Sequence, residues 1–466
     1  MAFTLTTRLR VPVALSLGVL LGSASIVLAQ SAFDTPAPFT GTVRFSGEQG
    51  APIYGGAEVS AAGTGFAPNQ PVTVLRGDER LSPEGLKADG EGKFSFDFLL
   101  PADAVVGIHP VVVQTDAPDS ADVIDFKVSP KIPVSGAEKF DITSKKVGRG
   151  LYQVAYSEKN KALFVAAAVG RPPVKESALY KLDPETLDVV AQVAPEAAPQ
   201  TGDRDPGVFA VYGIGLDDEK DTVWVTNTRQ NTVAVYAQGD LSLIKQFDLN
   251  TVPHPRDVVV DAANDKAYVS SAMNNLIAVF DTNTLEPLAP IELTSAQRGG
   301  RFSTMSLTLD PKGGKLYTVS MTSPEAAKID LATGEVQILK VPGSVSGAGV
   351  AVDPATGRLF VASQGSDDLI AIDTASEEVL FDTAVGAGAL NVAFDAKDGT
   401  AYVANRGADT ITVVDATSGE IIANLDAGSY PNQLIATADG TVYAVNKARG
   451  QDDTEGDMIW RIVPKK

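Results

Sequence analysis

The chain has 466 residues, a formal net charge of −20, two histidines and no cysteine. The lack of cysteine excludes a disulfide framework, a lipid anchor on cysteine and covalent haem attachment, so the fold must depend on a large apolar core. The acidic surface repels polyanions as a whole, and a role with nucleic acid would therefore need a local basic patch.

Residues 1–29 have the pattern of a secretory signal peptide. Arg8 and Arg10 give a positive start, residues 11–21 are mainly apolar, and small residues lead up to Ala29 as a cleavage site. A membrane anchor is the alternative, but Pro12 interrupts the apolar run, which is shorter than the roughly 20 residues that a span needs. We therefore expect an exported protein, most simply a periplasmic one, with no membrane span after cleavage.

Residues 36–130 predict a small immunoglobulin-like β-sandwich. Short runs with strand-like alternation are separated by turn sequences, which is typical of such a domain. The runs are residues 42–45, 58–61, 71–76, 93–99, 109–114 and 123–128. Residues 129–136 contain prolines and are expected to link this domain to the rest of the chain. Because the sandwich has its own alternating core, the remainder is expected to fold without it.

The rest of the chain repeats a strand that carries an aromatic residue. The intervals between successive aromatics are 60, 44, 49, 43, 42 and 41 residues. The aromatics are Phe164, Trp224, Tyr268, Tyr317, Phe360, Tyr402 and Tyr443. Repeats of about 40 residues with four strands each indicate propeller blades. Residues 138–466 are therefore expected to form a seven-bladed β-propeller, which makes the whole protein all-β.

An aspartate ends the third strand of most repeats. It lies thirteen residues after the aromatic in four repeats, and six inserted residues displace it in the first. The aspartates are Asp183, Asp281, Asp330, Asp373 and Asp415. Asp commonly caps its own turn, so we interpret these residues as turn caps and the aromatics as core, with no functional role for either set.

The seventh repeat lacks a fourth strand, because only three residues follow the strand at 458–463. Residues 138–146 lie upstream of the first blade and alternate Phe140 and Ile142 with polar residues. We expect them to pair as the outer strand of blade seven, which closes the ring and removes two exposed sheet edges.

Several stretches outside the generic repeat resemble a known family. They read VGRGLY, YKLDP, PRD, GRFST and YPN, at residues 147–152, 180–184, 255–257, 300–304 and 430–432. The repeats resemble the YVTN class of propellers and, from Val147 onward, the YncE-like periplasmic propellers. This resemblance implies a periplasmic protein associated with iron-limited growth that binds single-stranded DNA without a known enzymatic reaction. The added sandwich and the acidic charge depart from that family.

The longest loops are predicted to gather on one face, around the mouth of the central channel. They join the second and third strands of a blade, or one blade to the next, and functional residues usually occupy such variable loops. These insertions are residues 170–176, 194–207, 294–301 and 448–457.

Basic and aromatic residues are predicted to converge on this face. The candidate ligand-binding residues are Arg149, Tyr152, Arg229, His254, Arg256, Arg301, Phe302, Arg406, Tyr430, Asn432 and Lys447. Basic groups interleaved with aromatics suit a single-stranded nucleic acid or another anion. The alternative is a set of solvated loop ends neutralised by nearby acids. We expect a monomeric, non-enzymatic binding propeller with no cofactor.

Two other functions remain open. A metal-dependent propeller hydrolase or lactonase would use mouth residues such as Asp257, Asn391 and Asn432, and an envelope scaffold would bind a partner protein through the sandwich. His109 and His254 fall in different domains, so a histidine-rich metal site cannot form. The sequence has no phosphate-binding loop or nucleophile elbow, and we assign no catalytic or metal-ligating residue.

Overall fold

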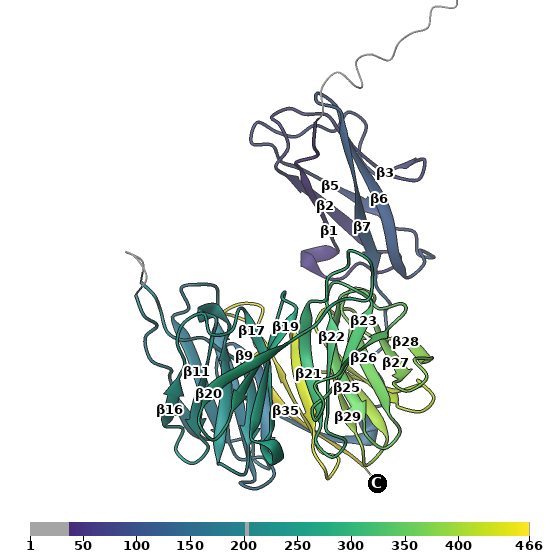
Figure 1. The fold of residues 1–466 in the computed structure, drawn as a ribbon. Coiled ribbons are helices and arrows are strands. Elements are labelled where there is room, and N and C mark those ends of the chain that lie inside the picture. The colour runs from purple at the N-terminus through teal and green to yellow at the C-terminus, as the bar shows by residue number, and fades with distance from the viewer. Residues whose placement is uncertain (1–36, 201–204, 466) are drawn as a thin grey trace, which may run out of the picture.

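The computed structural model describes residues 37–200 and 205–465, and the predicted signal peptide lies outside this part of the chain. The described strands form a small two-sheet domain followed by seven four-stranded sheets (Figure 1). This architecture confirms the predicted all-β propeller. Short 3-10 segments occur at η2 (Glu48–Gly50), η3 (Ala137–Lys139), η4 (Thr228–Gln230) and η5 (Ala262–Asn264).

The N-terminal domain has two antiparallel sheets around one apolar core. One sheet has the order β1 (Thr42–Ser46), β2 (Glu58–Thr64), β5 (Phe94–Leu99), and the other has the order β4 (Glu79–Arg80), β3 (Val72–Arg76), β6 (Gly107–Thr115), β7 (Ser120–Val128). Buried residues alternate along β2, as expected for a strand with one face in a core. Phe94, Phe96 and Phe126 belong to that core. The short strand β4 was not predicted, because two exposed residues carry no alternation.

The first four blades follow one another along the chain, each with its first strand innermost. Blade one has β9 (Leu151–Ser157), β10 (Ala162–Val169), β11 (Glu176–Leu182) and β12 (Val189–Val193). Blade two has β13 (Val211–Asp217), β14 (Thr222–Asn227), β15 (Thr232–Ala237) and β16 (Leu243–Gln246). Blade three has β17 (Pro255–Asp261), β18 (Lys266–Ser271), β19 (Leu276–Asp281) and β20 (Glu286–Glu292). Blade four has β21 (Thr304–Asp310), β22 (Lys315–Ser320), β23 (Glu325–Asp330) and β24 (Val336–Lys340).

The last three blades complete the ring. Blade five has β25 (Gly347–Asp353), β26 (Arg358–Ser363), β27 (Asp368–Asp373) and β28 (Val379–Ala384). Blade six has β29 (Ala389–Asp395), β30 (Thr400–Asn405), β31 (Thr410–Asp415) and β32 (Ile421–Asp426). Blade seven has β33 (Pro431–Ala436), β34 (Val442–Asn446), β35 (Met458–Pro464) and, as its outer strand, β8 (Phe140–Lys146). Each inner strand packs against the next, and β33 returns to β9.

Blade seven joins the two ends of the propeller sequence. β8 pairs antiparallel with β35, with Ile142 opposite Ile462 and Phe140 opposite Pro464. Phe140 packs into the core of blades six and seven, edge-on to the ring of Tyr402. The strand thus lies where the sequence analysis expects the closing strand, although its first expected residues, around Glu138, form the 3-10 segment η3 instead.

The repeated residues have the packing roles that the sequence analysis gives them. All seven repeat aromatics are buried between blades. The carboxylate of Asp281 accepts hydrogen bonds from the backbone N–H groups of Asn283 and Thr284, at 2.9 and 2.7 Å. Asp330, Asp373, Asp415 and Asp183 cap their turns in the same way.

The N-terminal domain is fastened to the propeller beside the channel mouth. Asp367, which is 1% exposed and lies between β26 and β27, accepts hydrogen bonds from Lys127 Nζ at 2.8 Å and Ser129 Oγ at 2.7 Å. The following segment is also held, because Ser135 pairs with Asn424 of β32. The expected linker at 129–136 is therefore a fixed strip along blade six, made by contacts between residues far apart in the sequence.

Candidate functional site at the channel mouth

Polar side chains line the channel at one level of the inner strands. The third residue of β9 is Gln153, and its Oε1 accepts a hydrogen bond from Ile214 N of the next blade at 2.9 Å. Asp257 accepts in the same way from Leu307 N, and Asn391 from Leu434 N. These hydrogen bonds link the inner strands of neighbouring blades. Asp257 and Asn391, two of the residues named for a hydrolase, therefore already take part in hydrogen bonds between blades.

A second level, one residue closer to the mouth, carries two tyrosines. Tyr152 and Tyr212 are the second residues of β9 and β13, and their rings meet edge to face with centroids 4.8 Å apart. Lys447 Nζ lies 5.2 Å from the centre of the Tyr152 ring, and the Arg229 guanidinium lies 5.7 Å from that of Tyr212. Cations over aromatic faces are held in place without neutralisation of their charge.

Arg406 is the central cation of the mouth. It immediately follows β30, and its Nη1 donates a hydrogen bond to Asn432 Oδ1 at 2.5 Å. Asn432 Nδ2 in turn donates to the carbonyl oxygen of Tyr152 at 2.6 Å. Two guanidinium groups lie over the ring of Tyr430, that of Arg406 at 4.7 Å and that of Arg449 at 4.4 Å from its centre.

Arg256 contributes a further cation from the second residue of β17. Its Nε is buried and has no hydrogen-bond partner among the residues that the structure describes. A buried donor without an acceptor is costly, and an acceptor brought by a ligand would remove that cost. We use the name mouth cluster for Tyr152, Tyr212, Arg229, Arg256, Arg406, Asn432 and Lys447.

Burial and mutual repulsion lower the pKa values of two cations in the mouth cluster. Burial and, to a smaller extent, the nearby positive charge of Arg406 together lower the pKa of Lys447 to about 8. Burial likewise lowers the pKa of Arg406, with Arg256 and Arg449 adding to the effect. Asp457 acts in the opposite direction on Lys447, but its Oδ1 already accepts hydrogen bonds from two backbone N–H groups. Arg406 and Lys447 are thus close enough to repel each other, and both donate their hydrogen bonds to neutral acceptors.

Two rim residues have strained backbones. His254 and Tyr430 each immediately precede the proline that starts an inner strand, and both have positive φ, at 45° and 50°. Positive φ is uncommon for a residue with a side chain, and such strain gathers at functional sites. The pKa of His254 is lowered by burial and then by Arg229 and Arg256. The lowered pKa favours the neutral form of this histidine, which lies beside the mouth cluster.

Three predicted site residues make other contacts. Phe302 is 2% exposed and packs in the core around Tyr268, so the expectation that it stacks on a ligand is wrong. Arg149 forms an exposed ion pair with Glu176. Arg301 is exposed ahead of β21, where its carbonyl oxygen accepts a hydrogen bond from Thr322. Residue type and loop position alone cannot tell which way such side chains point.

The mouth is not uniform around the ring. The residue immediately after the aromatic strand is Arg406 in blade six and Lys447 in blade seven, but Met321 in blade four. Met321 is 38% exposed, and Met273 on blade three is 71% exposed. One side of the mouth is therefore cationic and aromatic, and the other offers apolar side chains.

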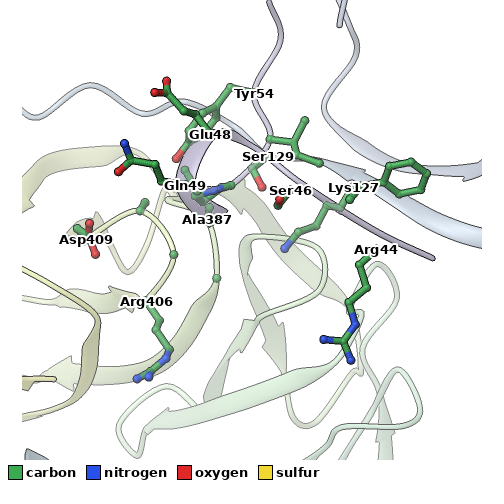
Figure 2. A pocket seen from close by; sticks show the side chains of 18 of the residues that line it. Arg44, Ser46, Glu48, Gln49, Tyr54, Lys127, Ser129, Ala387, Arg406 and Asp409 are labelled. Atoms are coloured by element: carbon green, nitrogen blue, oxygen red, sulfur yellow. The ribbon is translucent and has the colours of Figure 1, made fainter. Parts of the chain in front are cut away.

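A cleft of about 1050 Å³ lies between the N-terminal domain and the cationic side of the mouth. Figure 2 shows the side chains of Arg44 and Lys127 extending from the N-terminal domain toward the propeller, which carries Arg406 and Asp409. The cleft is also lined by Tyr54, whose pKa is raised by burial and by two aspartates. Its volume is at the upper end of the range for small-molecule sites.

No three histidine, cysteine or acidic side chains among the described residues group together in a way that could hold a metal ion. Within residues 37–200 and 205–465 no helix is long and apolar enough to cross a membrane.

Sequence reasoning missed Tyr212, Gln153 and Gln433. Tyr212 has the same register in β13 as Tyr152 in β9, and this register was the available signal. The long insertion before blade two hides it. Gln433 Oε1 accepts a hydrogen bond from Val154 N, so it belongs to the same polar level as Gln153.

The fold and the mouth cluster define a seven-bladed β-propeller with a polar channel and an added N-terminal domain. A family model described as outer membrane protein assembly factor BamB matches residues 338–463. Proteins named uncharacterized protein YncE are similar to part of the chain. The one from Escherichia coli (strain K12) is 28% identical over 208 residues, which are 43% of this chain and 53% of that protein. The one from Salmonella typhi is 30% identical over 205 residues, 42% of this chain and 53% of that protein.

The chain therefore spans about half the length of the curated relatives that it matches. Among solved structures, Kuenenia stuttgartiensis hydrazine synthase has a TM-score of 0.54 at 17% identity and covers 68% of this chain and 96% of its own. U3-55K has a TM-score of 0.56 at 9% identity and covers 70% and 98%. At these identities the similarity shows the propeller fold alone.

Proposed function

We propose that the protein is an exported, non-enzymatic binding propeller that holds an anionic group in the mouth cluster. Single-stranded DNA is the anion that the family resemblance favours, and a smaller phosphate or carboxylate compound is the alternative. Export to the periplasm is part of this proposal and is supported by the signal-like sequence of residues 1–29.

The buried, unpartnered Nε of Arg256 is the observation that carries the proposal. Beside it, Arg406 and Lys447 are held by an amide and by a backbone carbonyl rather than by carboxylates. A cation pays a desolvation cost on burial, which an incoming anion offsets. Charge-assisted hydrogen bonds to phosphate or carboxylate oxygens are among the stronger ones in proteins.

The arrangement favours an anionic group at the end of a ligand over a long strand laid across the face. Tyr152 and Tyr430 already have cations over their rings, and Phe302 is buried. Base stacking would therefore require Lys447 or Arg406 to move, whereas a terminal phosphate needs no such movement.

Fluorescence anisotropy with a short labelled oligothymidine, competed by inorganic phosphate, tests the proposal. We expect Arg406→Gln and Lys447→Met each to weaken binding by about tenfold, which is the value of one charge-assisted contact. Each change should also reduce the slope of log affinity against log salt by about 0.7. Arg76→Gln, an exposed change on the N-terminal domain, is the control.

The pH dependence gives a second readout. Lys447 has a pKa of about 8, so it carries its charge below that pH and loses it above. Affinity should therefore fall as the pH rises through 8, and Lys447→Met should remove most of that fall. Phosphate binding without oligothymidine binding would support a smaller anion and contradict DNA. Binding of both probes unchanged by the two substitutions would remove the mouth as the site.

A further inference from the structure

Strand β1 of the N-terminal domain presents a backbone edge to the cleft. Among the described strands it pairs with β2 alone. The side chains of Val43 and Phe45 pack inward on the core, yet all four residues 43–46 line the cleft. Side chains alternate along a strand, so four consecutive lining residues mean that the free edge of the backbone borders the cleft.

This edge is the unfinished side of its sheet. The sheet of β1 has three strands, whereas the sheet opposite has four. An exposed edge offers unpaired N–H and C=O groups, and proteins usually cover or blunt such edges. Here the cleft leaves space beside it instead, and an added strand would lie next to β2 and β5 as a fourth member.

Four cations and three acids line the cleft, the acids being Glu48, Asp125 and Asp409, so its lining carries a small excess of positive charge. Arg44 is exposed on β1 and its side chain extends toward the propeller, which carries Arg406 on the same cleft (Figure 2). Lys127 and Arg449 are already paired, with Asp367 and Asp409. Within residues 37–200 and 205–465, neither Arg44 nor Arg406 has such a carboxylate partner.

We propose that the cleft binds an extended acidic segment of a partner polypeptide, which adds to β1 as a further strand. The main chain of the segment would bond to the edge of β1, and an acidic side chain would lie between Arg44 and Arg406. Strand addition of this kind takes its affinity from main-chain bonds and its specificity from alternate side chains. The site shares Arg406 with the mouth cluster, so an anion bound to that guanidinium would compete with the acidic side chain of the segment.

A second copy of this chain fits the edge less well. Pairing of β1 with β1 would bring two Arg44 side chains onto one sheet, and like charges on neighbouring strands are destabilising. The acidic partner avoids this repulsion and supplies the missing carboxylate.

The test uses the full mature chain and a labelled peptide that alternates threonine with glutamate. Two matched peptides serve as controls: one has glutamine in place of glutamate, and the other has N-methyl groups on alternate backbone nitrogens. We expect the first peptide to bind and each control peptide to bind at least about tenfold more weakly. Arg44→Glu should weaken binding of the first peptide similarly, and Arg76→Glu, on the hairpin of β3 and β4, should not.

The outcomes separate this proposal from the mouth proposal. Lys447→Met should spare peptide binding, and Arg44→Glu should spare phosphate binding. If the N-methylated peptide bound as tightly as the first peptide, binding would be electrostatic only, and strand addition would be wrong. A concentration-dependent dimer that Arg44→Glu abolishes or strengthens would assign the edge to self-association and likewise overturn the proposal, as would the absence of peptide binding.

Discussion

The propeller and the N-terminal domain are built from the same kind of strand but treat their sheet edges differently. The propeller uses β8, taken from ahead of blade one, to complete blade seven and to close the ring. The N-terminal domain leaves β1 open beside a cleft. The difference indicates that edge closure serves stability in the larger domain, whereas an open edge in the smaller one is free to bind. Open edges are otherwise a risk for aggregation.

The largest expected effect comes from breaking the ring. Ile142→Pro places a proline in the middle of β8, opposite Ile462, and a proline cannot donate a ladder hydrogen bond. We expect the propeller to lose several degrees of Tm and to aggregate on heating, measured by calorimetry and light scattering. Ile142→Val keeps the strand and is the control. A Tm within about one degree of the parent would show that closure adds little to stability.

A middle-sized effect is expected at the junction of the two domains. Lys127→Met removes one of the donors to the buried carboxylate of Asp367 and should weaken docking by about 1–3 kcal/mol. Faster proteolytic cleavage within residues 129–136 under native conditions would report the loosened junction. Lys87→Met, at an exposed site on the same domain, should leave the cleavage rate unchanged. Equal rates in all three proteins would mean that other contacts hold the domains together.

The smallest effect is expected at Arg149. Its ion pair with Glu176 is about half exposed on both sides, and such pairs contribute less than about 1 kcal/mol. Arg149→Ala should therefore change neither Tm nor phosphate affinity by a measurable amount. A clear loss of affinity would instead place Arg149 in the mouth cluster.

Features set by local sequence were predictable, and features set by distant contacts were not. The turn cap at Asp281 depends on residues two and three positions away, so the sequence pattern reveals it. The fold follows from repeating such units. The contact of Lys127 with Asp367 joins positions 240 residues apart, and no local pattern encodes it.

The candidate site shows the same division between features set by local sequence and features set by distant contacts. Register along the inner strands places Arg256 and Asn432 at the mouth, and the sequence analysis found both. Phe302 has a similar position in the sequence, but it turns inward because the core between blades three and four has room for its ring. The cleft beside β1 depends on how two domains meet, which no repeat pattern contains.

The position of the closing strand β8 also determines when the ring can close during export. Lys465 donates a hydrogen bond to Glu138, a residue 327 positions earlier, so the ring is sealed by the two ends of its own sequence. Closing so long a loop is entropically costly, and topologies dominated by such distant pairings fold slowly. A chain threaded across a membrane from its N-terminal end would deliver β8 first and its partner β35 last. The ring would then stay open until translocation ends. During this period the exposed sheet edges make the propeller most prone to aggregation.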